Sequence, residues 1–186
     1  MANHEKPVIN GIQVDLGSLR AIRHKCRPGI CKDRHSCCTK YAPHVSHAEL
    51  ERIVGCFPAI AHYAGGIEGG SGYKNVFEEW GDATYRIDAN DDELCVFAYA
   101  LSSGEKLCAL HSAALDLKIP PAELKPKACS LWPLTLSDGA LPELSVDKRW
   151  HRFPCNTISE DTLHLDAGVI NIIASVFGLS FLENLI

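Results

Sequence analysis

The spacing of the cysteines constrains this chain more than any other feature of its sequence. The 186 residues include nine cysteines, yet no CxxC motif occurs. The chain therefore lacks the ligand pairs of zinc ribbons, the thioredoxin motif and the bacterial ferredoxin run. Instead, Cys37 and Cys38 are adjacent, in the stretch CKDRHSCCTK of residues 31–40. Neighbouring side chains of an extended backbone point in opposite directions, so the two thiols would serve two metal ions, or two corners of one polynuclear site.

The segment around this pair is rich in positive charge. Between residues 20 and 40 the chain has seven Lys and Arg residues and one Asp, although its formal net charge is −5. Such a run is often a solvated face, but this one also contains four of the nine cysteines. Clustered thiolates repel one another unless metal ions and nearby cations offset their charge. The candidates for that compensation are Lys25, Lys32, Arg34, His24 and His35.

The later cysteines are spread over most of the chain. Cys108 and His111 form a C-x2-H pair at the start of a predicted helix, where residues three apart share a face. His111 is therefore a candidate ligand, or a hydrogen-bond donor to a ligand. Cys56 follows a predicted helix and precedes the apolar stretch FPAI, so we expect it to pack in the core.

Three segments predict helices. Ser46 and Glu49 form a capping box, which begins a helix that ends near Gly55. A second helix is predicted over residues 108–119, where a pair of prolines follows. The tail has no charged residue between Asp166 and Glu183, which predicts a buried core helix over about residues 166–185.

The sequence also predicts several short strands, which are separated by turn residues. Residues 84–100 predict two strands, joined by a polar turn that begins at Asn90. The Asp138-Gly139 dipeptide, between two apolar stretches, indicates a hairpin. The glycine-rich residues 64–74 lack the GK[ST] ending of a phosphate-binding loop and predict a connection.

Together these patterns predict an α+β fold. We expect a small, irregular, cysteine-rich single domain over residues 1–186, with short antiparallel strands and several helices around a metal region. That region covers about residues 20–160, and the apolar C-terminal helix lies outside it.

The cysteines and their flanking residues resemble a known family. The pattern consists of Cys26, Cys31, Cys37 and Cys38, then CVF at Cys95, CALH at Cys108, LKPKACSLWPL at Cys129 and RWHRFPC at Cys155. It resembles the cysteine-cluster family named after YkgJ, whose members are described as zinc- or iron-chelating domains or iron–sulfur proteins. The resemblance implies metal binding through these eight cysteines. The first spacings, x4 and then x5, are longer than the CxxCxxCC of many members, and Cys56 falls outside the pattern.

Three classes of function remain open. The first is a protein with a polynuclear or iron–sulfur site that acts in redox chemistry or electron transfer. The second is a metal-dependent, methyltransferase-like enzyme, since a similar cysteine cluster occurs in flagellin lysine methylases. The third is a structural zinc protein. The expected cofactor is an iron–sulfur cluster or zinc or iron ions, and no catalytic residue is assigned.

Charge and hydropathy limit which partners and which cellular compartment the sequence predicts. The net charge of −5 disfavours nucleic acid, and the uncharged tail is too short to predict a membrane span. The N-terminal stretch MANHEKPVIN has no apolar segment typical of a secretory signal, so we expect the reducing cytoplasm. The apolar C-terminal helix is a candidate surface for a homodimer.

Overall fold

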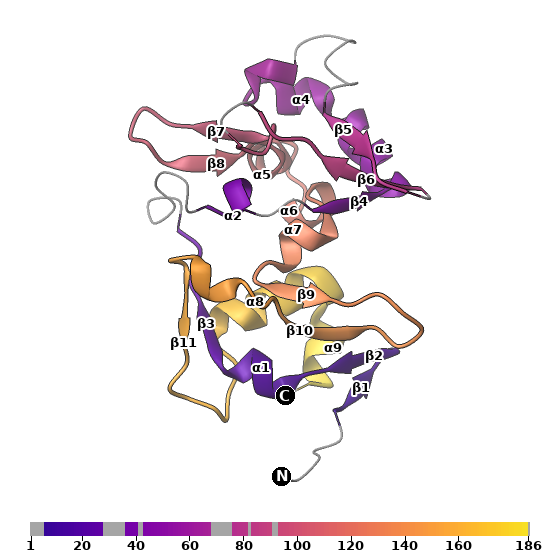
Figure 1. Ribbon diagram of the computed structural model, residues 1–186, viewed down its shortest axis with the longest axis vertical. Helices are drawn as coiled ribbons and strands as arrows, with labels where there is room; N and C mark the ends of the chain where they lie inside the picture. Colours follow the sequence, from indigo (N-terminus) through magenta and orange to yellow (C-terminus); the bar gives the residue numbers. More distant parts are fainter. Residues whose placement is uncertain are drawn as a thin grey trace. The chain divides into compact units, whose positions relative to one another are not determined.

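The computed structural model describes residues 6–27, 36–40, 43–67, 76–81, 83–90 and 93–185. Its helices and short, mostly antiparallel strands confirm the α+β class (Figure 1). The chain divides into two compact units. Residues 1–26 and 131–186 form unit 1, and residues 27–130 form unit 2. Among the described residues, none of the helices has both the length and the apolar character needed to cross a lipid bilayer.

Unit 1 is built from the two ends of the chain. Its strands are β1 (Val8–Ile9), β2 (Ile12–Val14), β3 (Ile22–His24), β9 (Leu134–Leu136), β10 (Glu143–Val146) and β11 (Asn156–Ile158). Its helices are α1 (Leu16–Arg20), the 3-10 helix η4 (Trp150–Arg152), α8 (Ala167–Phe177) and α9 (Leu179–Glu183). The strands form a sheet in the order β1-β2-β10-β9 and a separate β11-β3 pair. The β2–β10 pairing is parallel and joins the two parts of the sequence.

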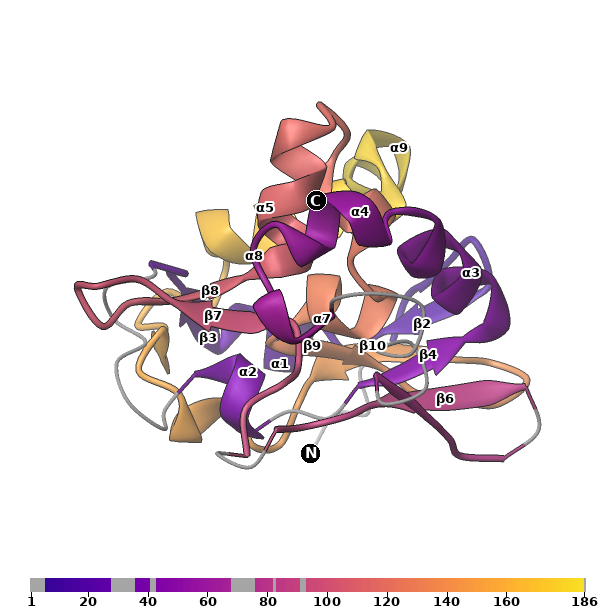
Figure 2. The ribbon, with the colours of Figure 1, turned by 90° about the horizontal axis from the view of Figure 1, so that it is seen from above.

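The antiparallel β9–β10 pair confirms the hairpin predicted at Asp138-Gly139. Gly139 lies in its connection with φ 128°, a conformation that favours glycine. Helices α8 and α9 lie behind this sheet in Figure 1, and the views in Figures 1 and 2 agree. Buried apolar side chains of α8 and α9 join the core of unit 1 with those of the sheet, among them Val14, Leu144, Ile173 and Phe181.

The C-terminal segment is two helices instead of the single one expected over residues 166–185. Gly178 separates α8 from α9 with φ 85° and ψ 166°, which is far from helical geometry. Glycine adopts a positive φ without steric cost, so the chain can turn at this position. Both helices still bury apolar residues, as the uncharged tail predicts.

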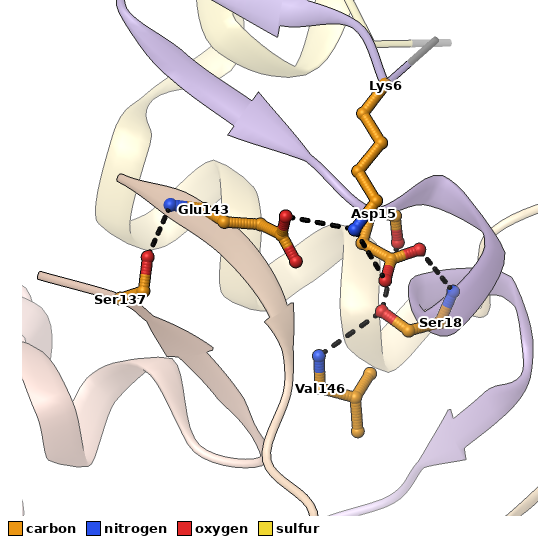
Figure 3. Close-up of polar contacts among 6 residues, drawn as sticks. All are labelled: Lys6, Asp15, Ser18, Ser137, Glu143 and Val146. Atoms are coloured by element: carbon orange, nitrogen blue, oxygen red, sulfur yellow. Dashed lines mark hydrogen bonds and ion pairs between the residues drawn. The ribbon is translucent and has the colours of Figure 1, made fainter. Parts of the chain in front are cut away.

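A lysine and two carboxylates tie the N-terminal residues to the sheet of unit 1 (Figure 3). Lys6 Nζ lies 3.3 Å from Asp15 Oδ2 and 2.9 Å from Glu143 Oε2. Asp15 also caps α1, where its Oδ1 accepts a hydrogen bond from Ser18 N. The Ser18 hydroxyl donates to Asp15 O and accepts from Val146 N, which links α1 to β10.

Unit 2 contains the middle of the chain. Its strands are β4 (His44–Ser46), β5 (Phe77–Glu79), β6 (Thr84–Ile87), β7 (Ala98–Ala100) and β8 (Lys106–Cys108). Its helices are α2 (Cys37–Lys40), α3 (His47–Gly55), α4 (Phe57–Ala61), the 3-10 helix η2 (Gly65–Ile67), α5 (Ala109–Asp116), α6 (Pro121–Leu124) and α7 (Lys127–Leu131), whose last residue belongs to unit 1. The strands form a β4-β6-β5 sheet and a β7-β8 hairpin. Of the predicted glycine-rich connection, residues 68–74 lie outside the described part of the chain.

The two helices predicted in unit 2 are confirmed. Helix α3 has the complete capping box: Ser46 Oγ accepts from Glu49 N, and the Glu49 carboxylate accepts from Ser46 N at 2.9 Å. Helix α5 starts after Cys108 and ends before Lys118, which has φ 57°. The core of this unit includes buried side chains from α3, α5 and the strands, such as Val45, Ile53, Phe97 and Leu110.

The second strand expected within residues 84–100 is shorter and paired differently. Strand β6 ends at Ile87, and only the isolated Ala89–Cys95 bridge continues toward the turn. Strand β7 begins at Ala98 and pairs with β8, not with β6. Between the two strands, Cys95 N donates its hydrogen bond to Cys38 O at 2.8 Å, so this stretch of backbone also contacts α2.

A single carboxylate joins α8 to β3 in unit 1. Asp166 Oδ1 accepts hydrogen bonds from Gly168 N at 2.9 Å and from His24 N at 3.0 Å. The backbones approach so closely that a Cβ on Gly168 would lie 1.9 Å from His24 O. Only glycine fits at this contact.

We predict that Gly168→Ala lowers the free energy of unfolding by about 2 kcal/mol or more, because the backbones must separate. Gly17→Ala, in α1 of the same unit, is the matched control, since its Cβ would make an ordinary contact at 3.5 Å. Denaturant unfolding of both variants checks this. Equal denaturant midpoints of unfolding for the two variants would refute the close contact between Gly168 and His24 O.

Candidate metal centre

The adjacent cysteines lie on the short helix α2, not on the extended backbone that we expected. Successive side chains of a helix are about 100° apart, so both can face the same region. Here the interaction between the two neighbouring thiols shifts their pKa values in opposite directions, down at Cys37 and up at Cys38. The pair therefore acts as one group instead of pointing to opposite sides.

Backbone hydrogen bonds bring Cys95 and Cys108 to this pair. Cys95 N donates to Cys38 O at 2.8 Å, which places Cys95 beside α2. Cys108 ends β8, where it pairs with Ala98 of β7, and Ala109 N donates to Phe97 O at 2.8 Å. Figures 1 and 2 both show α2 next to the β7–β8 hairpin. Three distant stretches of sequence thus meet at one place in unit 2.

Cys129 joins the group from α7. The charge on its thiolate would interact with those of Cys37, Cys95 and Cys108. Cys38 is also close enough to interact with Cys95 and Cys108. We call these five residues the thiol cluster: Cys37, Cys38, Cys95, Cys108 and Cys129. All five are free thiols.

The surroundings of these thiols shift their pKa values by different amounts and in different directions. The hydrogen bond from Cys38, opposed by burial and aided by the positive charge of Lys125, lowers the pKa of Cys37 to about 6. The same hydrogen bond, together with burial and the neighbouring negative charges, raises the pKa of Cys38 well above its ordinary value. Burial raises the pKa of Cys95 to about 12 and raises that of Cys129 as well. Without a metal ion, the thiolate is therefore favoured at Cys37 and the neutral thiol at Cys38, Cys95 and Cys129.

Among the described cations, Lys125 is near enough for its charge to act on the thiols of the cluster. Burial lowers the pKa of this amine, but thiolate charge at Cys108, Cys129, Cys37 and Cys38 outweighs it, so the pKa is raised. Sequence reasoning missed this residue because it lies far from the basic segment of residues 20–40. The signal was present in LKPKAC, where Lys125 precedes Cys129 by four residues.

The cations expected from the basic segment are not seen at the cluster. Lys32, Arg34 and His35 lie outside the described residues, as does Cys31. His24 belongs to unit 1, where its Nδ1 lies 2.7 Å from Asn156 Oδ1. Their predicted role as compensating charges stays a prediction.

His111 lies on α5, three residues after Cys108, and its side chain is largely exposed. Partial burial, and then the positive charge of Lys125, lower its pKa. The neutral imidazole is thus favoured, which is the form that binds metals or accepts a hydrogen bond. Its role as a ligand stays a prediction.

The remaining cysteines divide between the core and unit 1. Cys56 is partly buried and packs against the core of unit 2, in agreement with its predicted packing role. In unit 1, Lys25 N donates to Cys155 O at 2.9 Å, next to the β3–β11 pair. Cys26 follows directly in the sequence, so Cys26 and Cys155 lie on neighbouring backbone segments.

The donor set of the thiol cluster suits a thiophilic metal. Zinc and iron–sulfur clusters are both bound by cysteine thiolates, commonly four per site. Within the described ranges, no three or more His, Cys, Asp or Glu side chains are arranged to hold an ion together. Metal binding would displace thiol protons, including the one shared by Cys37 and Cys38.

In comparisons with known proteins, no protein-family model, no curated protein and no solved structure matches this chain. The resemblance to the YkgJ family therefore stays a hypothesis that rests on the cysteine pattern alone.

We predict that reduced, metal-free protein contains a thiol whose alkylation rate rises with a midpoint near pH 6, the value for Cys37. The thiolate is the nucleophile, so the reaction is slow below this pH and fast above it. Alkylation rates across a pH series check this. Cys37→Ser should remove the early phase, and Cys56→Ser should retain it. A first midpoint above about pH 8, the range of an ordinary cysteine, would contradict the arrangement.

Proposed function

We propose that this chain is a metal-binding protein whose cysteines hold an iron–sulfur cluster or a polynuclear zinc or iron site, with a role in redox chemistry or electron transfer. The observation that carries the proposal is the gathering of five cysteines from four stretches of sequence in one part of unit 2. Four thiolates complete a usual zinc or iron–sulfur ligand set, so the chain brings enough cysteines to this part of unit 2, and their side chains would have to move closer together to hold an ion.

Ordinary core packing explains the thiol cluster less well. Isolated cysteines behave as small apolar residues, as Cys56 does. The cluster instead places Lys125 among the thiols, and a partly buried ammonium is costly unless anions accompany it. Metal-bound thiolates provide those anions.

The proposed ligands extend beyond the thiol cluster to the other cysteines of the resemblance: Cys26, Cys31 and Cys155. Eight cysteines are more than a single four-thiolate site requires. The bound metal would supply either one-electron redox chemistry, if it is iron–sulfur, or structural cross-linking, if it is zinc. The chain's own residues would hold the site, and Cys95 and Cys129 are partly buried within unit 2.

We predict that protein purified without oxygen carries at least two metal ions per chain. Elemental analysis gives the number and identity of the ions, and the absorption spectrum distinguishes the classes, because zinc thiolates are colourless and iron–sulfur clusters absorb visible light. Folded protein with one ion or none would contradict a polynuclear site.

We also predict that Cys37→Ser and Cys38→Ser each reduce the metal content, because serine does not replace a thiolate ligand. Cys56→Ser is the matched control, since Cys56 packs against the core and lies outside the ligand pattern. Metal content per folded chain, measured after identical purification, tests the difference. Equal metal loss in all three variants would refute the assignment of ligands.

A further inference from the structure

Strand β11 of unit 1 has one open edge. It pairs antiparallel with β3 in a two-stranded sheet, where Ile158 lies directly opposite Ile22. Among the strands of the described residues, none pairs with the other edge of β11. The outer edge of β3 is covered, since His24 N donates to Asp166 Oδ1 at 3.0 Å. Figure 1 shows β11 on the outer side of this pair.

The hydrogen bonds between β11 and β3 show which backbone groups face the open edge. Lys25 N donates to Cys155 O at 2.9 Å at one end of the pair. At the other end, Ser159 N donates to Ala21 O at 2.9 Å. In an antiparallel pair, residues that exchange hydrogen bonds alternate with residues that do not. Ile158 precedes Ser159, so its N–H and C=O point away from β3, where a further strand can bind them.

An apolar side chain accompanies these groups. Ile158 is 74% exposed, whereas Ile22 opposite it is 1% exposed. Directly opposite residues lie on the same face of a sheet, so an apolar row crosses the pair and ends at the open edge. Exposed edges are commonly protected from association by charged residues or proline, and the strand sequence Asn-Thr-Ile has neither. This edge is therefore suited to pairing with another strand.

The charges on the two sides of Ile158 have opposite signs. On one side are the exposed cations Lys25, opposite Cys155, and Arg152. On the other side are the exposed carboxylates of Glu160 and Asp161. A second copy that runs antiparallel brings its acidic side to the basic side of the first, and the reverse. The surface is thus complementary to itself, which favours a second copy of this chain over an unrelated partner.

We propose that β11 is a self-association surface, on which the β11 strand of a second copy pairs antiparallel about a two-fold axis at Ile158. The N–H of Ile158 in each copy then donates to the C=O of Ile158 in the other. The two sheets join into one of four strands, in the order β3-β11-β11-β3, with a continuous apolar row. Lys25 of each copy lies level with Asp161 of the other. The inference makes no use of a bound metal.

The experiment measures the dissociation constant of the dimer by sedimentation of the full chain over a concentration series. A reducing agent is present, so that no disulfide imitates the dimer. We expect Ile158→Lys to raise this constant at least tenfold, because two ammonium groups then face each other at the axis. Leu179→Lys is the matched control. Leu179 is 68% exposed on α9 of the same unit, outside the strand, so this variant should dimerise like the unsubstituted chain.

Charge reversal tests the complementarity separately. Lys25→Glu and Glu160→Lys should each raise the dissociation constant by about threefold or more at low ionic strength, since the symmetric contact counts each change twice. The double variant reverses both sides and should return to within about twofold of the unsubstituted chain. High salt should reduce these differences.

The contrary outcomes are equally distinct. A chain that stays monomeric up to about 1 mM would overturn the inference, as would a dimer that Ile158→Lys leaves unchanged. Weakening by Leu179→Lys alone would place the contact on the C-terminal helices. A double variant weaker than both single variants would refute the antiparallel arrangement. Circular dichroism checks the folding of each variant, and if Ile158→Lys does not fold, the charge-reversal series decides the question.

Discussion

The hydrogen bond from Cys95 N to Cys38 O is the contact on which the organisation of the candidate site depends. It attaches α2 to the segment that leads into the β7–β8 hairpin, and the hairpin in turn places Cys108 at the start of α5. This contact is a direct backbone link between the adjacent thiols of α2 and the segment that carries the later cysteines. Beyond β6, the Ala89–Cys95 bridge continues the pairing toward the turn, so the backbone at Cys95 contacts both this stretch and α2.

Electrostatics then determines what this arrangement can do. Thiols brought together in a partly buried place resist ionising together: the pKa of Cys37 is lowered, whereas those of Cys38 and Cys129 are raised. A metal ion changes this balance because it replaces the protons of several thiols at once. Lys125 acts in the same direction, since it favours thiolate over thiol at Cys37 and Cys129. These two effects support the proposed metal binding, and the identity of the metal decides whether the site has redox chemistry.

In unit 1, the main structural feature is the joining of the N-terminal and C-terminal parts of the chain. The parallel β2–β10 pair, the ion pairs of Lys6 and the Asp166 carboxylate each connect an N-terminal residue to a C-terminal one. The close approach at Gly168 makes the last of these connections intolerant of a side chain. Cys26 and Cys155 lie next to the β3–β11 pair of this unit, on adjacent backbone segments.

Local interactions let the sequence by itself determine several elements. The capping box at Ser46, the helix after Cys108 and the hairpin at Asp138-Gly139 depend on residues a few positions apart, so their patterns are readable without a structure. The absence of CxxC likewise excluded several metal motifs directly. Only the tertiary structure decided which cysteines meet, that Lys125 lies among them, and that the C-terminal segment breaks at Gly178. Those features depend on contacts between segments far apart in the sequence, and no local pattern encodes such distances.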